Sequence, residues 1–186
     1  MEYGNRNNYI NKNYHSNNNN FDKQDKYSNT TKVKFIKDNL NVHFDENDTI
    51  VGDNNKNFVD VAEDVIKKIK SEMDKKMCND LSTSKIRNIL AMIAEIYKYV
   101  ISDSGENSIS SEINSKLQYF KIRCYYEIGR DREQAGKKIS SVEMLFENSN
   151  ILDLIKDINN KKRVINYYHY FESLIAWHKY YIGKEN

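Results

Sequence analysis

Apolar residues recur at every third or fourth position over most of the chain after residue 55, which is the spacing of amphipathic helices. The pattern predicts five helices, over about 58–77, 83–100, 110–126, 140–158 and 161–182. Capping residues support the starts, since Ser82 or Thr83 can cap the second helix and Ser108 or Ser110 the third. We therefore expect an all-α fold, a compact bundle of about five helices.

Polar stretches separate these segments. Residues 129–138 carry six charged side chains and two glycines, which favours a polar connection between the third and fourth helices. Asn148-Ser149-Asn150 weakens the middle of the fourth helix. Gly183 follows the last helix, where a glycine commonly ends a helix.

The third predicted helix is apolar on two sides. One stripe contains Ile113, Leu117, Phe120 and Cys124, and the opposite side carries Tyr119, Ile122 and Tyr126. A helix of this kind is either central in a bundle or shared with a partner.

The N-terminal part has a different character. Residues 1–54 form an Asn-rich, low-complexity arm that we expect to be largely disordered, because it offers little apolar surface to bury. Within it, Val33–Ile36 and Val42–Phe44 alternate weakly, which is consistent with a short strand pair or with a segment that docks on a neighbour. Residues 55–186 form the expected helical domain.

Composition narrows the function class. The formal net charge is +2, so binding of nucleic acid would depend on local clusters of cations. The chain has two cysteines without a CxxC motif, no run of 18 apolar residues and no apolar signal segment at its start. These features predict a cytoplasmic protein without a membrane partner.

No motif indicates catalysis. Nucleotide-binding glycine loops and the GxSxG motif are absent, and Cys124 lies on an apolar stripe as a core residue would. His169 and His178 point to opposite sides of one helix, so they do not form a metal pair. We expect no catalytic residue, no metal and no cofactor.

Cations do cluster beside the apolar stripes. Arg87 lies about 125° from the middle of the second helix's stripe, where a phosphate backbone could approach it. Other candidates are Lys85, Lys121, Arg123, Arg130, Arg132, Lys137 and Lys138. The alternative is a solvated face in which these cations pair with Glu95, Glu127, Asp131 and Glu133.

Four strings, in this order, are similar to the small subunit of the type III-A (Csm) CRISPR effector complex. They are Leu81-Ser-Thr-Ser-Lys-Ile-Arg-Asn88, Leu117-Gln-Tyr-Phe-Lys121, Tyr126-Glu-Ile-Gly-Arg-Asp131 and Tyr170-Phe-Glu-Ser-Leu-Ile-Ala-Trp-His-Lys-Tyr180. The resemblance covers roughly Phe58 to Gly183 and leaves out the N-terminal quarter. It departs at His169, where the family usually has an arginine.

The resemblance implies an all-helical, non-enzymatic subunit that packs along guide RNA and target RNA in antiviral and anti-plasmid defence. Its partners would be the other Csm subunits, including further copies of itself. By this resemblance Lys85, Arg87, Lys121 and Arg130 would contact RNA, and Arg123, Arg132, Lys137 and Lys138 are candidates by charge. The alternative function is a helical protein–protein adaptor that binds no RNA and uses the two-sided third helix.

Overall fold

The computed structural model describes residues 40–183. The helices are α2 (Phe58–Asp74), α3 (Thr83–Ser102), α4 (Ser111–Ala135), α5 (Ser141–Asn148), α6 (Ile151–Leu154) and α7 (Lys161–Tyr181). Two strands, β1 (His43–Phe44) and β2 (Ile50–Val51), and two 3₁₀ turns, η1 (Asp53–Asn55) and η2 (Ile155–Asp157), complete the described residues. The expected all-α bundle is confirmed.

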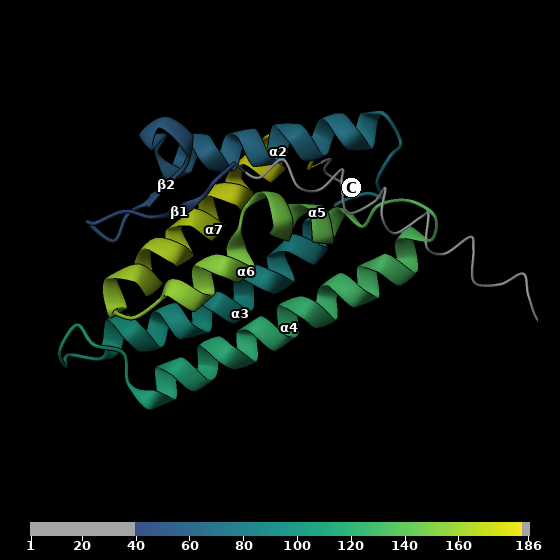
Figure 1. Cartoon of the computed structure of the whole chain (residues 1–186). Helices are drawn as coiled ribbons and strands as arrows, with labels where there is room; N and C mark the ends of the chain where they lie inside the picture. Colours follow the sequence, from purple (N-terminus) through teal and green to yellow (C-terminus); the bar gives the residue numbers. More distant parts are fainter. Residues whose placement is uncertain (1–39, 184–186) are drawn as a thin grey trace, which may run out of the picture.

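α7 lies between α2 on one side and α3 on the other (Figure 1). α4 lies on the outside of the bundle against α3 and α5. α4 therefore buries one side and leaves the other side open along its length. α4 is therefore not the central helix of the bundle, and its second apolar stripe faces outward.

Polar side chains cap the starts of α2, α3, α4, α5 and α7, and the sequence indicated two of these caps, Ser82 and Ser110. The N-cap side chains each accept a hydrogen bond from a backbone N–H of the first turn, which satisfies donors that have no partner inside the helix. These caps are Asn57, Ser82, Ser110, Ser140 and Asn160.

An aromatic cluster from α7 and α4 fills the centre of the core. Tyr167, Phe171 and Phe120 meet edge to face, with ring centroids 5.3–6.4 Å apart. The hydroxyl of Tyr167 donates to the carbonyl of Ile151 at 3.1 Å, so its polar tip is satisfied inside the protein. The aromatic side chains of α7 therefore lie at the centre of the bundle.

The expected polar connection over 129–138 is wrong for most of its length. α4 continues to Ala135 and ends at Gly136, whose φ of +59° suits a glycine. The last two turns stay helical because Ile128, Asp131 and Ala135 are buried against α3 and α5. The many charged residues of this stretch made the buried side of the helix difficult to recognise from the sequence.

The fourth predicted helix divides into three pieces. Asn150 adopts the left-handed conformation, with φ 55°, and separates α5 from α6. Its side chain donates to the carbonyl of Val42 at 2.7 Å, which ties this break to the N-terminal hairpin. The weak middle seen in the sequence is therefore a turn held by a distant contact.

The strand pair forms, but with another partner. β1 and β2 pair antiparallel through His43–Val51 and Phe44–Ile50. Val33–Ile36 and the Asn-rich residues 1–31 lie outside the described residues. Asp48 in the hairpin loop accepts from Arg163 Nε at 2.6 Å, so residues 40–54 are packed on the bundle through α7.

Trp177 joins α7 to the first turn of α2. Its indole Nε1 donates to the Val59 carbonyl at 2.9 Å, and its ring stacks on Tyr181 at 5.7 Å. Tyr181 in turn donates to Glu63 of α2 at 2.5 Å. Over residues 40–183, no helix combines the length and the apolar character needed to cross a membrane.

Candidate nucleic-acid interface

Lys85 is held inside the protein at the start of α3. Its Nζ lies 2.5 Å from Asp131 Oδ1 and donates to the carbonyl of Asp80 at 3.2 Å. The side chain is 19% exposed. Lys85 therefore has a structural partner, and its contact with RNA stays a prediction.

Asp131 is the centre of a buried network that joins α3, α4 and α5. Its carboxylate also accepts from Ser140 Oγ at 2.7 Å, from the Val142 N–H at 3.1 Å and from Asn79 Nδ2 at 2.9 Å. Burial alone would raise the pKa of Asp131, but these hydrogen bonds and the one from Lys85 outweigh it and lower the pKa. The carboxylate is therefore charged at neutral pH, and both of its oxygens accept hydrogen bonds from the protein.

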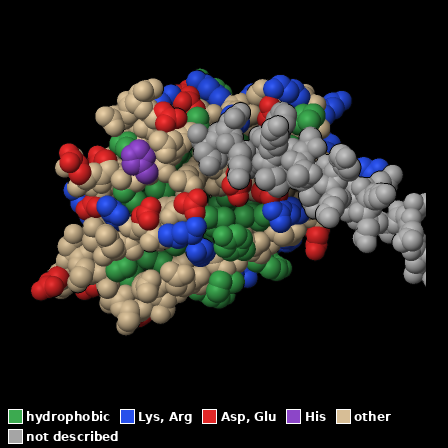
Figure 2. All heavy atoms as spheres, in the orientation of Figure 1, with side chains coloured by type: hydrophobic (Ala, Val, Ile, Leu, Met, Phe, Trp, Pro, Cys, Tyr) green, Lys and Arg blue, Asp and Glu red, His purple; other side chains and the backbone are tan. Residues whose placement is uncertain are grey.

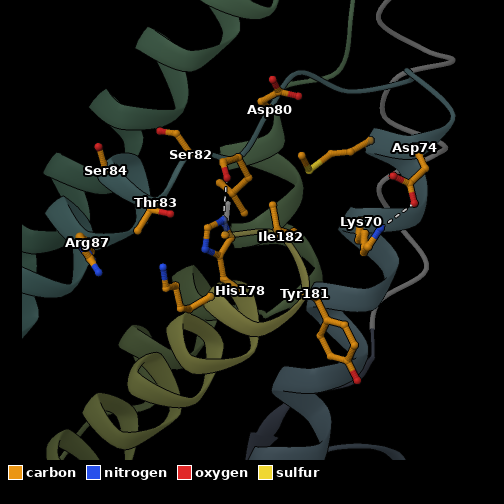
Figure 3. A pocket seen from close by; sticks show the side chains of 14 residues that line it. Lys70, Asp74, Asp80, Ser82, Thr83, Ser84, Arg87, His178, Tyr181 and Ile182 are labelled. Atoms are coloured by element: carbon orange, nitrogen blue, oxygen red, sulfur yellow. Dashed lines mark hydrogen bonds and ion pairs between the residues drawn. The ribbon is translucent and has the colours of Figure 1, made fainter. Parts of the chain in front are cut away.

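Arg87 lies two residues after Lys85 on α3 and is exposed. Its side chain makes no hydrogen bond or ion pair with another residue in the range 40–183. It lines a cavity of about 790 Å³ whose wall includes Thr83 of α3, Lys70 of α2 and His178 of α7. Figure 3 shows Arg87 at one side of this cavity and the Lys70–Asp74 pair at the other. Its guanidinium is available to an external acceptor.

His178, an ordinary helix histidine by its sequence, is fully buried in the wall of this cavity. Its Nε2 donates to the Leu81 carbonyl at 2.7 Å, so this nitrogen carries the proton. Burial lowers the pKa of His178, so the ring is neutral at neutral pH. Nδ1 has no hydrogen-bond partner among the described residues. His178 therefore fixes the start of α3 to the end of α7.

On α4, Arg123 and Arg130 share one carboxylate. Arg130 lies 2.5 Å from Glu127 and Arg123 lies 4.0 Å from it. Glu127 is buried, whereas both arginines are about two-fifths exposed. One buried negative charge thus positions two outward cations and leaves a net positive surface. Arg123 also lies over the ring of Tyr126, 5.2 Å from its centroid.

Lys121 and Arg132 lie on the other flank of α4. Lys121 is half-buried and has no ion pair within residues 40–183. Arg132 binds Glu143 of α5 through two of its nitrogens, with Nε 2.8 Å from Oε2. This bidentate pair occupies much of the donor capacity of Arg132.

Lys137 and Lys138 follow Gly136 in the short connection between α4 and α5. Both are exposed. They are the two candidates that do lie in a loop, and their side chains make no ion pair with a residue of the described part of the chain.

The eight candidates therefore do not form one patch. Arg87 lies at the α2–α3–α7 cavity, Arg123 and Arg130 lie on the outer face of α4, and Arg132 borders a groove between α4, α5 and α6. Part of the alternative, in which the cations form ion pairs within the protein, is observed. Glu127 pairs with Arg123 and Arg130, and Asp131 pairs with Lys85.

The outward stripe of α4 is exposed, as its two-sided pattern allowed. Tyr119, Ile122, Tyr125 and Tyr126 are 53–64% exposed. Figure 2 shows hydrophobic side chains gathered over α4 with cationic side chains beside them. The sequence pattern missed Tyr125, which lies between the two predicted stripes, and a helical wheel extended to every aromatic residue would have found it.

The cysteines and histidines offer no reactive site in the described residues. Burial raises the pKa of Cys78 to about 11 and raises that of Cys124 further, so both thiols stay protonated. Within residues 40–183, no three His, Cys, Asp or Glu side chains come together as they would around a metal ion. His169 instead lies 2.9 Å from Glu172 of its own helix.

Comparison with known proteins gives a consistent result. Residues 72–184 match the family model Csm2 Type III-A. The chain is 34% identical over 103 residues to the CRISPR system Cms protein Csm2 of Enterococcus italicus, an alignment that covers 55% of this chain and 69% of that one. It is 30% identical over 129 residues to the protein of the same name from Streptococcus thermophilus, covering 69% of this chain and 94% of the relative.

The matched span contains the whole of α3, α4, α5, α6 and α7, and therefore every candidate cation named above. The four strings that resembled the small subunit lie within it as well. The chain belongs to the Csm2 family of type III-A CRISPR systems.

Proposed function

We propose that this Csm2 chain, a structural subunit of the type III-A effector complex, binds RNA without catalysing its cleavage and packs along the guide–target duplex. Its expected partners are guide RNA, target RNA, the other Csm subunits and further copies of itself. The expected location is the cytoplasm. The expected role is in defence against viruses and plasmids.

One observation carries the RNA-binding part of this proposal. Cations without a full set of internal partners are fixed on rigid helices, with Arg87 on α3 and Lys121 and Arg130 on α4. Helix-borne cations bind phosphate and sugar rather than base edges, so they suit a subunit that must accept any guide sequence. The positive potential at the surface also includes contributions from Arg123, Lys137 and Lys138. By contrast, the side chains of Lys85 and Arg132 are paired with carboxylates of the protein itself.

The test compares effector complexes reconstituted with and without this chain. Target-RNA affinity is measured at several salt concentrations with two unrelated guides. We expect the chain to increase affinity for both targets alike and to make the dependence of log Kd on log salt steeper. Equal affinity and equal slopes for both complexes would favour the adaptor function, in which the chain contacts only protein.

The absence of catalysis has its own test. The purified chain, incubated with target RNA and Mg²⁺, is expected to leave the RNA intact, because both thiols are protonated and the buried carboxylates are engaged in ion pairs. Cleavage that a helix-preserving substitution in this chain abolishes would contradict the proposal.

A further inference from the structure

The tyrosines on the outer face of α4 differ from the other tyrosines that the structure describes. The side chains of Tyr119 and Tyr125 make no hydrogen bond and no ring contact with a residue in the range 40–183, and the side chain of Tyr126 has only the guanidinium of Arg123 over its ring. The other tyrosines in that range each have a hydrogen bond or a ring contact: they are Tyr97, Tyr99, Tyr167, Tyr168, Tyr170, Tyr180 and Tyr181. The rings of Tyr119 and Tyr125 therefore have no stacking partner among the described residues, and the ring of Tyr126 has one cation over it.

These rings lie close to positive charge. Tyr119, Ile122 and Tyr126 follow one another at helical spacing, with Arg123 and Arg130 along one edge. Glu127, the acidic residue between the two arginines, is buried and shared by both. A surface of exposed tyrosines edged by cations suits a ligand with flat apolar faces and negative charge.

The backbone leaves room beside the rings. Gly129 lies one turn beyond Tyr125 and Tyr126, and a side-chain carbon placed there would meet no atom within 4 Å. The face of α4 is thus open on the C-terminal side of the tyrosines, where Arg130 begins the next turn. A strand lying along this face can continue past the tyrosines without meeting a side chain at residue 129.

We propose that the outer face of α4 binds single-stranded RNA, with unpaired bases stacked on Tyr119, Tyr125 and Tyr126 and phosphates held by Arg123 and Arg130. This inference rests on the proposed RNA-binding function and specifies which kind of RNA this face takes. A second copy of the chain fits the face less well, because two α4 faces brought together would oppose their arginines. A protein partner is the competing outcome. Three of the four exposed large hydrophobic side chains on α4 are tyrosines, which favours stacking over aliphatic packing.

The test titrates the full chain with a fluorescein-labelled 20-nucleotide oligouridylate and with a 20-base-pair RNA duplex, each at several salt concentrations. The variants are Tyr119→Ala/Tyr126→Ala and Tyr119→Phe/Tyr126→Phe. Tyr180→Ala is the matched control, because Tyr180 is 75% exposed but lies on α7.

The double alanine variant is expected to bind oligouridylate at least tenfold more weakly, with an unchanged salt slope, because stacking releases no counterions. The double phenylalanine variant and Tyr180→Ala should bind within threefold of wild type, and duplex affinity should change little. Wild-type oligouridylate affinity in the double alanine variant would overturn the inference, as would a wild-type chain that binds no oligouridylate.

The failure of this inference differs from the failure of the proposed function. If the double alanine variant keeps its affinity for RNA but is no longer incorporated into reconstituted complexes, the face docks protein and the stacking inference is wrong. Salt-dependent binding of target RNA by the complex would still support the proposed function in that case. Loss of that binding contribution would count against the proposed function itself.

Discussion

The ammonium group of Lys85 and the carboxylate of Asp131 are 46 positions apart in the chain and 2.5 Å apart in space. Their contact joins the first turn of α3 to the last turns of α4, and Ser140 and Val142 extend it to α5. Three helices therefore depend on one buried carboxylate for their mutual position.

Asp131→Ala should reduce the free energy of unfolding by about 3 kcal/mol, because it leaves the amine of Lys85 and the donors of α5 without their acceptor. Urea unfolding followed by circular dichroism measures this change. Asp153→Ala is the control, because it removes an exposed pair with Lys156 and should cost less than about 1 kcal/mol. Equal losses in the two variants would mean that the network stabilises nothing beyond a surface pair.

His178 should make the protein less stable in mild acid. Burial lowers its pKa in the folded state, so below pH 6.5 the unfolded chain takes up a proton that the folded chain resists. Stability that is present above that pH is lost as the pH falls, by up to about 1.4 kcal/mol per pH unit for one group.

Urea unfolding at pH 7.5, 6.5 and 5.5 tests this sign. His178→Gln should flatten the slope in this range even if it lowers stability throughout, since its side chain does not titrate. The carboxylates with lowered pKa values, such as Asp131 and Asp103, lose their contribution only at lower pH, below their unfolded values. A slope that is the same in wild type and variant would show that another group is responsible.

Arg87→Ala, Lys121→Ala and Arg130→Ala should each weaken target-RNA binding by the reconstituted complex by about 1 kcal/mol and lower the salt slope by about one. The losses should be similar for unrelated guides. Helix content measured by circular dichroism should not change.

Arg132→Ala should have a smaller effect, because Glu143 already binds two of its nitrogens. Lys56→Ala, in the connection between η1 and α2, is a control that should leave affinity unchanged. Unchanged affinity and slope in all three main variants would leave these cations as solvated surface.

Asn150→Ala should cost about 2 kcal/mol of stability. About half comes from placing a Cβ-bearing residue without a polar side chain at φ 55°, and the rest from the lost hydrogen bond to Val42. Asn150→Gly accepts the backbone conformation and should cost only about 1 kcal/mol. Thermal unfolding of both variants checks the order, and an alanine variant at least as stable as the glycine variant would contradict it.

Helices whose inward side is apolar could be predicted from the sequence, and helices whose inward side is charged could not. α3 could be predicted from its apolar stripe, which consists of five buried residues: Ile86, Ile89, Ile93, Ile96 and Val100. The last turns of α4 were missed because Glu127 and Asp131 face inward there, and their burial depends on Arg130 and Lys85. Lys85 becomes a partner of Asp131 only once the chain has folded.

The candidate site also has one feature that the sequence could predict and one that it could not. The exposed side of α4 could be predicted, because a stripe opposite a core stripe must face either a partner or solvent. That Arg87 and Arg130 lie on different surfaces could not, because their separation depends on how α3 and α4 pack. Sequence spacing within one helix says nothing about the angle between two helices.

The bond from Trp177 to the Val59 carbonyl gives the molecule a built-in optical probe. Trp177 is the single tryptophan of the chain, and it lies where the C-terminal half of α7 meets the beginning of α2. Opening of that junction would expose its indole to water and shift its emission to longer wavelengths. Tryptophan fluorescence can therefore follow α2 separating from α7 while circular dichroism follows the helices themselves, and a difference between the two signals would reveal whether α2 detaches first.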